Sequence, residues 1–132
     1  MPNLNRRYIP LFVAFGLGLF WLYMFFVFQY RHDSALLDAI IGHDVQAARQ
    51  AFTDGATMRM PLRLHSTFLH AAAYQGNVEM AKLLVEHGAA ERADAEDDEG
   101  HTALYIAQVN GHTEMADYLR SLMATNHAKD AP

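Results

Sequence analysis

The side chains best suited to chemistry in this chain of 132 residues are its eight histidines and an acidic run at residues 94–100. No two histidines stand at a clear metal-ligand spacing, and neither a cysteine nor a His-Glu-x-x-His arrangement occurs in the sequence. A phosphate-binding glycine loop and a nucleophile elbow are absent as well. We therefore predict no enzymatic activity and no cofactor, and we prefer structural roles for the histidines over a metal site.

The acidic run at residues 94–100 shares some features with a calcium-binding loop. Its glycine, Gly100, arrives one place late, and Tyr105 stands at the twelfth position, where such a loop carries a bidentate glutamate. A solvated loop between two structural units is the better interpretation of the run. Weak calcium binding remains the alternative.

A long apolar run lies near the N-terminus. Residues 11–28 carry no charge, and at about 1.5 Å per helical residue they span roughly 27 Å, against a bilayer core of about 30 Å. Arginines flank the run, and Tyr8 and Tyr30 stand at the interfacial positions that aromatic rings prefer. The pattern predicts a retained transmembrane helix over residues 8–30, with the lipid bilayer as its partner.

The same segment contains small residues at a spacing that permits two helices to approach closely. Ala14 and Gly18 are four residues apart, and Gly16 lies between them. This arrangement predicts a weak homodimer through Ala14 and Gly18.

The remainder of the chain contains an internal repeat. Residues 67–76 align with residues 102–111 at a spacing of 35 residues, and residues 34–43 form a third copy 33 residues earlier. Such a period predicts a stacked array in which each unit is a pair of helices and neighbouring units share one core. Each copy begins with a hydroxyl residue suited to cap a helix, namely Ser34, Thr67 and Thr102.

The motifs within these copies resemble the ankyrin repeat family. The middle copy reads Thr-Phe-Leu-His-Ala-Ala-Ala at residues 67–73 and continues with Gly76, a Leu-Leu pair and a closing Gly-Ala, and the last copy starts with His-Thr-Ala-Leu at residues 101–104. The resemblance covers about residues 34–123. It is weaker at the ends, where His43 replaces the usual turn glycine and the last copy lacks the closing Gly-Ala.

The apolar run and the resemblance together predict an all-α fold in which an N-terminal single transmembrane helix precedes a three-unit ankyrin-like helical solenoid. The predicted boundaries are a basic N-terminal tail at 1–7, the transmembrane helix at 8–30, a short linker at 31–33, repeats within 34–123 at about 34–66, 67–101 and 102–123, and a flexible tail at 124–132.

What the resemblance implies about activity is binding of other proteins without chemistry. In the family's pattern a histidine at the position of His70 ties adjacent loops together by hydrogen bonds, which neutral imidazole can both donate and accept. From Arg31 onward, eight basic residues stand against fifteen acidic ones, a net charge of −7. We expect no nucleic-acid partner, because such an acidic domain is repelled by phosphates.

Two columns of residues in the first helices of the repeats are the candidate contact surface for a partner protein. One column is Ile41, Tyr74 and Val109, and the second includes Asp38 and Ile106. Exposed apolar side chains with a hydrogen-bonding tip are typical of contact sites. The alternative is that these side chains only pad the inner helices against each other.

The loop after the first repeat is a second candidate surface, because apolar and basic residues alternate along it. This period of two is typical of an extended hairpin with one apolar and one basic face. Such a hairpin could bind an acidic partner or lipid headgroups. The alternative is an ordinary finger loop with Met60 and Leu64 tucked under the neighbouring repeat. The candidate contact residues are Met58, Arg59, Met60, Leu62 and Arg63.

Charges around the apolar run predict its orientation. Arg6 and Arg7 precede it, whereas Arg31 alone follows closely, so the rule that basic flanks stay inside places the N-terminus in the cytoplasm. We thus expect a single-pass membrane protein with extracytoplasmic repeats, periplasmic if the chain is bacterial. Cytoplasmic repeats are the alternative.

Together these patterns predict a membrane-anchored module that binds another protein, itself membrane-associated, as an adaptor, an assembly factor or an inhibitor of the immunity type. The alternative function is a structural subunit of a larger membrane complex whose working part is the transmembrane helix.

Overall fold

The computed structural model describes residues 9–59, 62 and 66–129, and of residues 9–15 it describes the helix alone. In these ranges the chain is helical, with one isolated β-bridge between Glu96 and Thr102. The helices are α1 (Ile9–Ile41), α2 (Val45–Thr53), α3 (Phe68–Gln75), α4 (Val78–Glu86), the 3-10 helix η2 (Ala89–Arg92), α5 (Ala103–Val109) and α6 (Thr113–Lys129).

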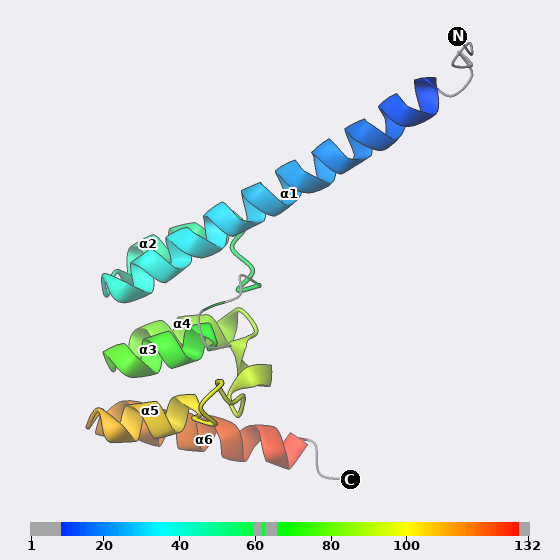
Figure 1. Cartoon of the computed structure of the whole chain (residues 1–132). Helices are drawn as coiled ribbons and strands as arrows, with labels where there is room; N and C mark the ends of the chain where they lie inside the picture. The colour runs from blue at the N-terminus through cyan, green and yellow to red at the C-terminus, as the bar shows by residue number, and fades with distance from the viewer. Residues whose placement is uncertain (1–8, 60–61, 63–65, 130–132) are drawn as a thin grey trace.

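The helices form three antiparallel pairs that stack side by side. α1 pairs with α2, α3 with α4, and α5 with α6, and α3 lies between α1 and α5 in one row while α4 lies between α2 and α6 in the other (Figure 1). This arrangement confirms the all-α helical array predicted from the period of 33 to 35 residues.

The core lies between the two rows and continues through all three pairs. Alanines, including Ala48, Ala72 and Ala107, are fully buried and allow the helices to approach closely. Each fully buried large side chain contributes roughly 1.5–3 kcal/mol of hydrophobic stabilisation. The large apolar side chains that are fully buried are Leu36, Ile40, Leu69, Met80, Leu83, Leu84, Met115 and Leu119.

Polar side chains and left-handed residues mark where each helix begins and turns. Asp44, Asn77 and Thr102 accept hydrogen bonds from backbone N–H groups three residues later, as N-caps do. Gly76 ends α3 at φ +70°, and His43 takes the equivalent turn after α1 at φ +57°. The first turn thus keeps the left-handed geometry of the later turn, although His43 has a side chain where Gly76 has none.

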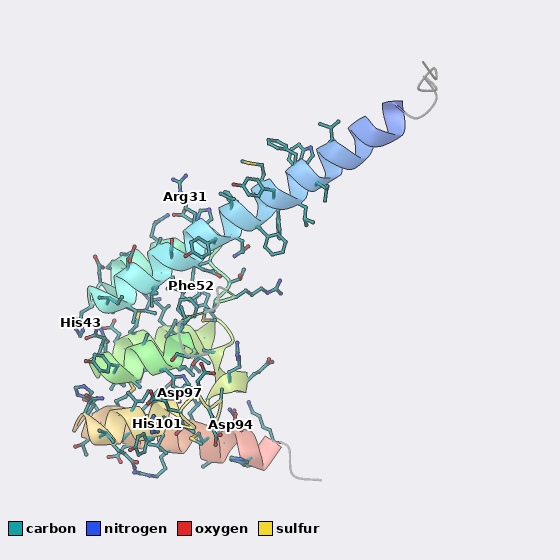
Figure 2. The ribbon with its side chains drawn as sticks, in the orientation of Figure 1. Arg31, His43, Phe52, Asp94, Asp97 and His101 are labelled. Carbon is teal, nitrogen blue, oxygen red and sulfur yellow. The ribbon has the colours of Figure 1, made fainter. Side chains whose placement is uncertain are left out.

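The apolar run and the first helix of the array are one continuous helix, which corrects the predicted short linker at residues 31–33. α1 passes through Gln29 and Asp33 without a break, and Asp33 is fully buried against the array. The segment at residues 16–28 projects beyond the array with its side chains exposed; Trp21, for example, is 73 % exposed (Figures 1 and 2).

The predicted transmembrane helix over residues 8–30 is wrong. Within the described residues, every helix is either too short or too polar along its length to cross a bilayer. The physical reason is that the apolar turns of α1 run directly into Gln29, Arg31, His32 and Asp33, and Gln29 and Asp33 bind the loop of the first pair. The single-pass localisation and the orientation inferred from the flanking charges are overturned with it, and the bilayer as partner and the transmembrane subunit role lose their support.

Other predicted segments lie partly outside the described residues. The basic tail at residues 1–7, and the side chain of Ala14 in the predicted homodimer contact, are among them. At the C-terminus, helix α6 continues to Lys129, so most of the predicted flexible tail at 124–132 is helical. Asn126 holds this end by donating from Nδ2 to the Ala90 carbonyl oxygen at 2.6 Å.

Candidate functional site

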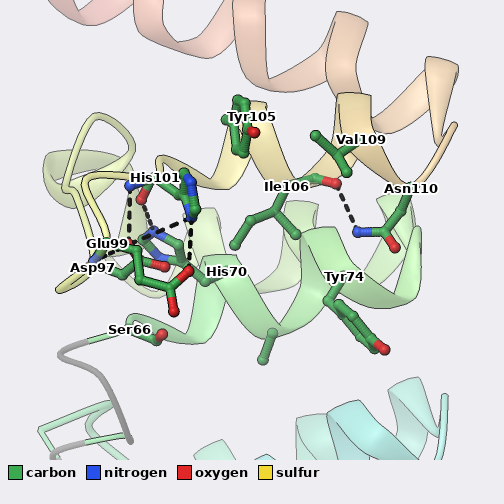
Figure 3. A pocket seen from close by; sticks show the side chains of 11 residues that line it. Ser66, His70, Tyr74, Asp97, Glu99, His101, Tyr105, Ile106, Val109 and Asn110 are labelled. Atoms are coloured by element: carbon green, nitrogen blue, oxygen red, sulfur yellow. Dashed lines mark hydrogen bonds and ion pairs between the residues drawn. The ribbon is translucent and has the colours of Figure 1, made fainter.

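A groove of about 620 Å³ lies between α3 and α5 and is closed at one end by the loop before α5 (Figure 3). Carboxylates and histidines gather at the loop end, whereas Tyr74, Val109 and Asn110 lie at the other end. The lining residues are Ser66, His70, Ala71, Tyr74, Asp97, Glu99, His101, Tyr105, Ile106, Val109 and Asn110.

His70 forms the base of the loop end and is buried. Its Nε2 donates to the His101 carbonyl oxygen at 3.0 Å, and its Nδ1 accepts from the Thr67 backbone N–H at 3.1 Å and lies 2.8 Å from the Thr67 hydroxyl oxygen. A neutral imidazole with its proton on Nε2 satisfies all of these contacts. Because both ring nitrogens are occupied, His70 serves as a tie between α3 and the next loop, as the resemblance implied, and has no nitrogen free for catalysis.

Asp97 organises the loop at the acidic end of the groove. Its Oδ1 accepts from the backbone N–H groups of Glu99 and His101, both at 2.9 Å. The His101 N–H is the largest cause that lowers the pKa of Asp97 from its ordinary value; partial burial opposes it, and the Glu99 N–H adds to it. This carboxylate is therefore held ionised by its own loop.

The rim above Asp97 is made by two stacked rings and the carboxylate of Glu99. The His101 ring lies 4.4 Å from the Tyr105 ring at an interplanar angle of 10°, and His101 Nδ1 is 3.4 Å from Glu99 Oε2. The Glu99 side chain is 61 % exposed. The loop thus presents a carboxylate at the mouth of the groove and an aromatic wall beside it.

Among the predicted contact residues, Tyr74, Val109 and Ile106 come together in the groove. Tyr74 is 62 % exposed and Val109 is 66 % exposed, while Ile106 is half-buried. Ile41, 55 % exposed, and Asp38 are exposed on α1 but do not line this groove.

The predicted contact loop after the first repeat is only partly described. Met58 and Leu62 are half-buried and pack against the core, whereas Arg59 is exposed. Met58 has φ +57°, which interrupts the extended path expected for a hairpin. Met60 and Arg63 lie outside the described residues.

Sequence reasoning missed the buried carboxylate that holds this loop. Asp33 accepts from the backbone N–H groups of Thr57 at 2.7 Å, Met58 at 3.1 Å and Arg59 at 2.9 Å. Gln29 reinforces the contact by donating from Nε2 to Thr57 Oγ1 at 2.7 Å. The partners are more than twenty residues apart, so no local pattern in the sequence pointed to them.

Metal ligation has no support in the geometry of the described residues, where no three His, Asp or Glu side chains are grouped as ligands would be. In the acidic run, where weak calcium binding is the alternative from the sequence, Asp97 accepts hydrogen bonds from the backbone of its own loop.

Comparison with known proteins places these features in a family context. Residues 26–130 match the family profile described as ankyrin repeats in three copies. The chain is 39 % identical over 97 residues to Potassium channel AKT3 of Oryza sativa subsp. japonica, covering 74 % of this chain and 9 % of the channel. It is 37 % identical over 76 residues to Diacylglycerol kinase iota of Rattus norvegicus, covering 57 % of this chain and 7 % of the kinase. It is 43 % identical over 68 residues to Protein phosphatase 1 regulatory subunit 27 of Homo sapiens, covering 48 % of this chain and 43 % of that protein.

Proposed function

Because this chain belongs to the ankyrin repeat family, whose arrays are protein–protein interaction modules, we propose that it binds a partner protein in the groove between α3 and α5. The match confirms the family predicted from residues 34–123. The chain spans less than half the length of each relative named above, so the activities of those proteins are not carried over.

The observation that carries the proposal is that Tyr74 and Val109 are exposed along the same groove that Ile106 lines. Each of the two outer side chains is more than half exposed, although both are large and apolar. Aromatic and aliphatic side chains gathered in a groove with a few polar groups are typical of contact sites, because a partner gains hydrophobic stabilisation by covering them. The surrounding helices hold these side chains in place without covering them.

The chemistry of the groove favours binding over catalysis. His70 and Asp97, the titratable groups deepest in it, are both engaged by backbone groups of the array. A nucleophile with a free base beside it is not formed by the lining residues. The role that fits is an adaptor, an assembly factor or an inhibitor. The relative named as a phosphatase regulatory subunit supports a role of this regulatory kind.

The remaining predicted contacts extend the proposed surface beyond the groove. Ile41 and Asp38 carry it along the exposed side of α1, and Arg59 presents a positive charge from the loop that Asp33 holds. Met58 and Leu62 contribute only the surface that their packing leaves free. Met60 and Arg63 stay predictions from the sequence, as does a weak homodimer through Ala14 and Gly18.

Site-specific photo-crosslinking tests the proposal directly. A photoreactive amino acid is placed at Tyr74, at Val109 or, as a matched control, at Glu79, which is exposed on α4 in the opposite row. In cells that naturally make the protein, we expect one discrete crosslinked protein from positions 74 and 109 and none from position 79. Equal crosslinking from all three positions would contradict the proposal.

A further inference from the structure

The two ends of the groove differ in chemistry, and this difference restricts what can fill it. We infer that the partner segment is basic and apolar, with a lysine or arginine side chain that meets Glu99 and an apolar side chain that covers Tyr74 and Val109. This inference rests on the proposed function and adds the chemical class of the partner.

The charge of the lining is one-sided. Among the residues that line the groove, Asp97 and Glu99 are carboxylates, and none is a lysine or an arginine. Asp97 is bound by its own loop, whereas the Glu99 side chain is mostly exposed, and within the described residues its carboxylate contacts the neighbouring His101 ring. A cationic side chain at the mouth would complement this charge, whereas an acidic segment or a nucleic acid would meet like charge.

The sequence around the rim adds to the negative charge at this end of the groove. Residues 90–99 carry six acidic side chains and one basic residue, Arg92. Arg92 lies on η2 and lines a different cavity, so it does not neutralise the mouth of the groove. The field at this end is therefore negative and should attract a basic segment before contact is made.

The apolar end lies one helix length away. From Thr102, at the start of α5, to Val109 the helix rises roughly 10 Å at about 1.5 Å per residue. An extended chain covers this distance in about three residues at roughly 3.3 Å each. The partner's basic and apolar side chains should therefore be separated by about three residues.

The aromatic rim fits the same partner. His101 and Tyr105 stack with their rings nearly parallel, and this wall stands beside Glu99. A guanidinium group can lie flat on an aromatic face while it donates to a carboxylate, so arginine should be preferred over lysine.

Selection from a random peptide library displayed on phage, with the full chain as target, tests the inference. Binders to the exposed apolar residues of α1 are removed first by passage over the double variant Tyr74→Asp, Val109→Asp, which keeps α1 unchanged. We expect the enriched peptides to carry arginine or lysine about three residues from a leucine, isoleucine or aromatic residue.

Charge reversal then locates the basic side chain. For a selected peptide, Glu99→Lys should raise the Kd at least tenfold. Glu79→Lys on α4 should leave the Kd within twofold of the value for the parent protein. A peptide with its basic residue changed to glutamate should recover affinity for the Glu99→Lys variant. Circular dichroism verifies that each variant retains its helices.

The outcomes separate this inference from the proposed function. Neutral or acidic peptides that still require Tyr74 and Val109 would overturn the basic–apolar partner and leave the groove as the binding site. If no peptide is enriched on the full chain after the library has passed over the double variant, both the proposed function and the basic–apolar partner are overturned.

Discussion

Asp33 is a buried carboxylate whose charge is compensated by three backbone N–H groups of one loop. It is fully buried, and the N–H groups belong to Thr57, Met58 and Arg59. A hydrogen bond to a charged group contributes about 1.5–3 kcal/mol, and a buried N–H left without an acceptor costs roughly 1–3 kcal/mol. We expect Asp33→Ala to lower the free energy of unfolding by about 3 kcal/mol or more, measured by urea denaturation.

The control for this prediction lies on the same helix. Asp38 is exposed on α1, so Asp38→Ala should change the free energy of unfolding by less than about 0.5 kcal/mol. Equal effects of the two substitutions would mean that the contacts of Asp33 with the loop contribute nothing particular to stability.

His43 occupies a backbone conformation that favours glycine. Its φ is +57°, whereas Gly76 and Gly111 take the corresponding turns at +70° and +75°. A side chain in the left-handed region costs roughly 1–2 kcal/mol, part of which is offset because glycine is more flexible in the unfolded chain. We therefore expect His43→Gly to raise the free energy of unfolding by about 1 kcal/mol, visible as a higher Tm.

A glycine placed in a regular helix should have the opposite effect. Arg49 is exposed in the middle of α2, and Arg49→Gly should lower the free energy of unfolding by about 1 kcal/mol. If His43→Gly also destabilised the protein, a contact of the imidazole would outweigh the backbone strain.

At the scale of the elements, the sequence predicted the repeat helices because their signals are local. Thr67 and Thr102 stand one residue before α3 and α5, and Gly76 follows α3 directly. The extent of α1 was not predictable in the same way. Residues 19–41 contain neither glycine nor proline, so no local signal separates the apolar turns from the repeat helix that follows them. Apolar composition then suggested a membrane span where the structure has one continuous projecting helix.

The site was predictable to the extent that it follows the repeat. Tyr74 and Val109 occupy equivalent positions in successive copies, so the repeat alignment placed them in one column. For the acidic end of the groove the sequence predicts only a solvated loop, because the groove forms there only once Asp97 has folded that loop. The tie between Asp33 and residues 57–59 required the stacked structure itself.

The loop before α5 should depend on pH through Asp97. Backbone N–H groups lower the pKa of Asp97 in the folded protein, so its contribution to stability is complete above the unfolded value of about 3.9 and is lost as pH falls through the lower folded value. We expect Asp97→Asn to be less stable than the parent at pH 7 and the difference to shrink below about pH 4. Thermal unfolding of both proteins between pH 7 and pH 3 measures this. A difference that stays constant over that range would contradict the role of the carboxylate.

At the scale of the whole molecule, stability comes from contacts between neighbouring helix pairs, as in other repeat proteins. The core is continuous from Leu36 in the first pair to Leu119 in the last, and no pair could bury its apolar face alone. The projecting part of α1 stands outside this core. Its side chains from residue 16 to residue 28 are exposed, whereas Gln29 and Asp33 bind the loop of the first pair.

Two truncations should therefore behave differently. Removing residues 1–27 should change the free energy of unfolding of the array by less than about 0.5 kcal/mol, because none of the described side chains removed is buried. It should also reduce self-association in sedimentation experiments, since a large exposed apolar surface is lost. Removing residues 1–33 deletes Gln29 and Asp33 as well, and should lower the free energy of unfolding by about 3 kcal/mol or more, as Asp33→Ala does. If the shorter truncation unfolded the array, the projecting helix would have to contribute to its core, contrary to the exposure of its side chains.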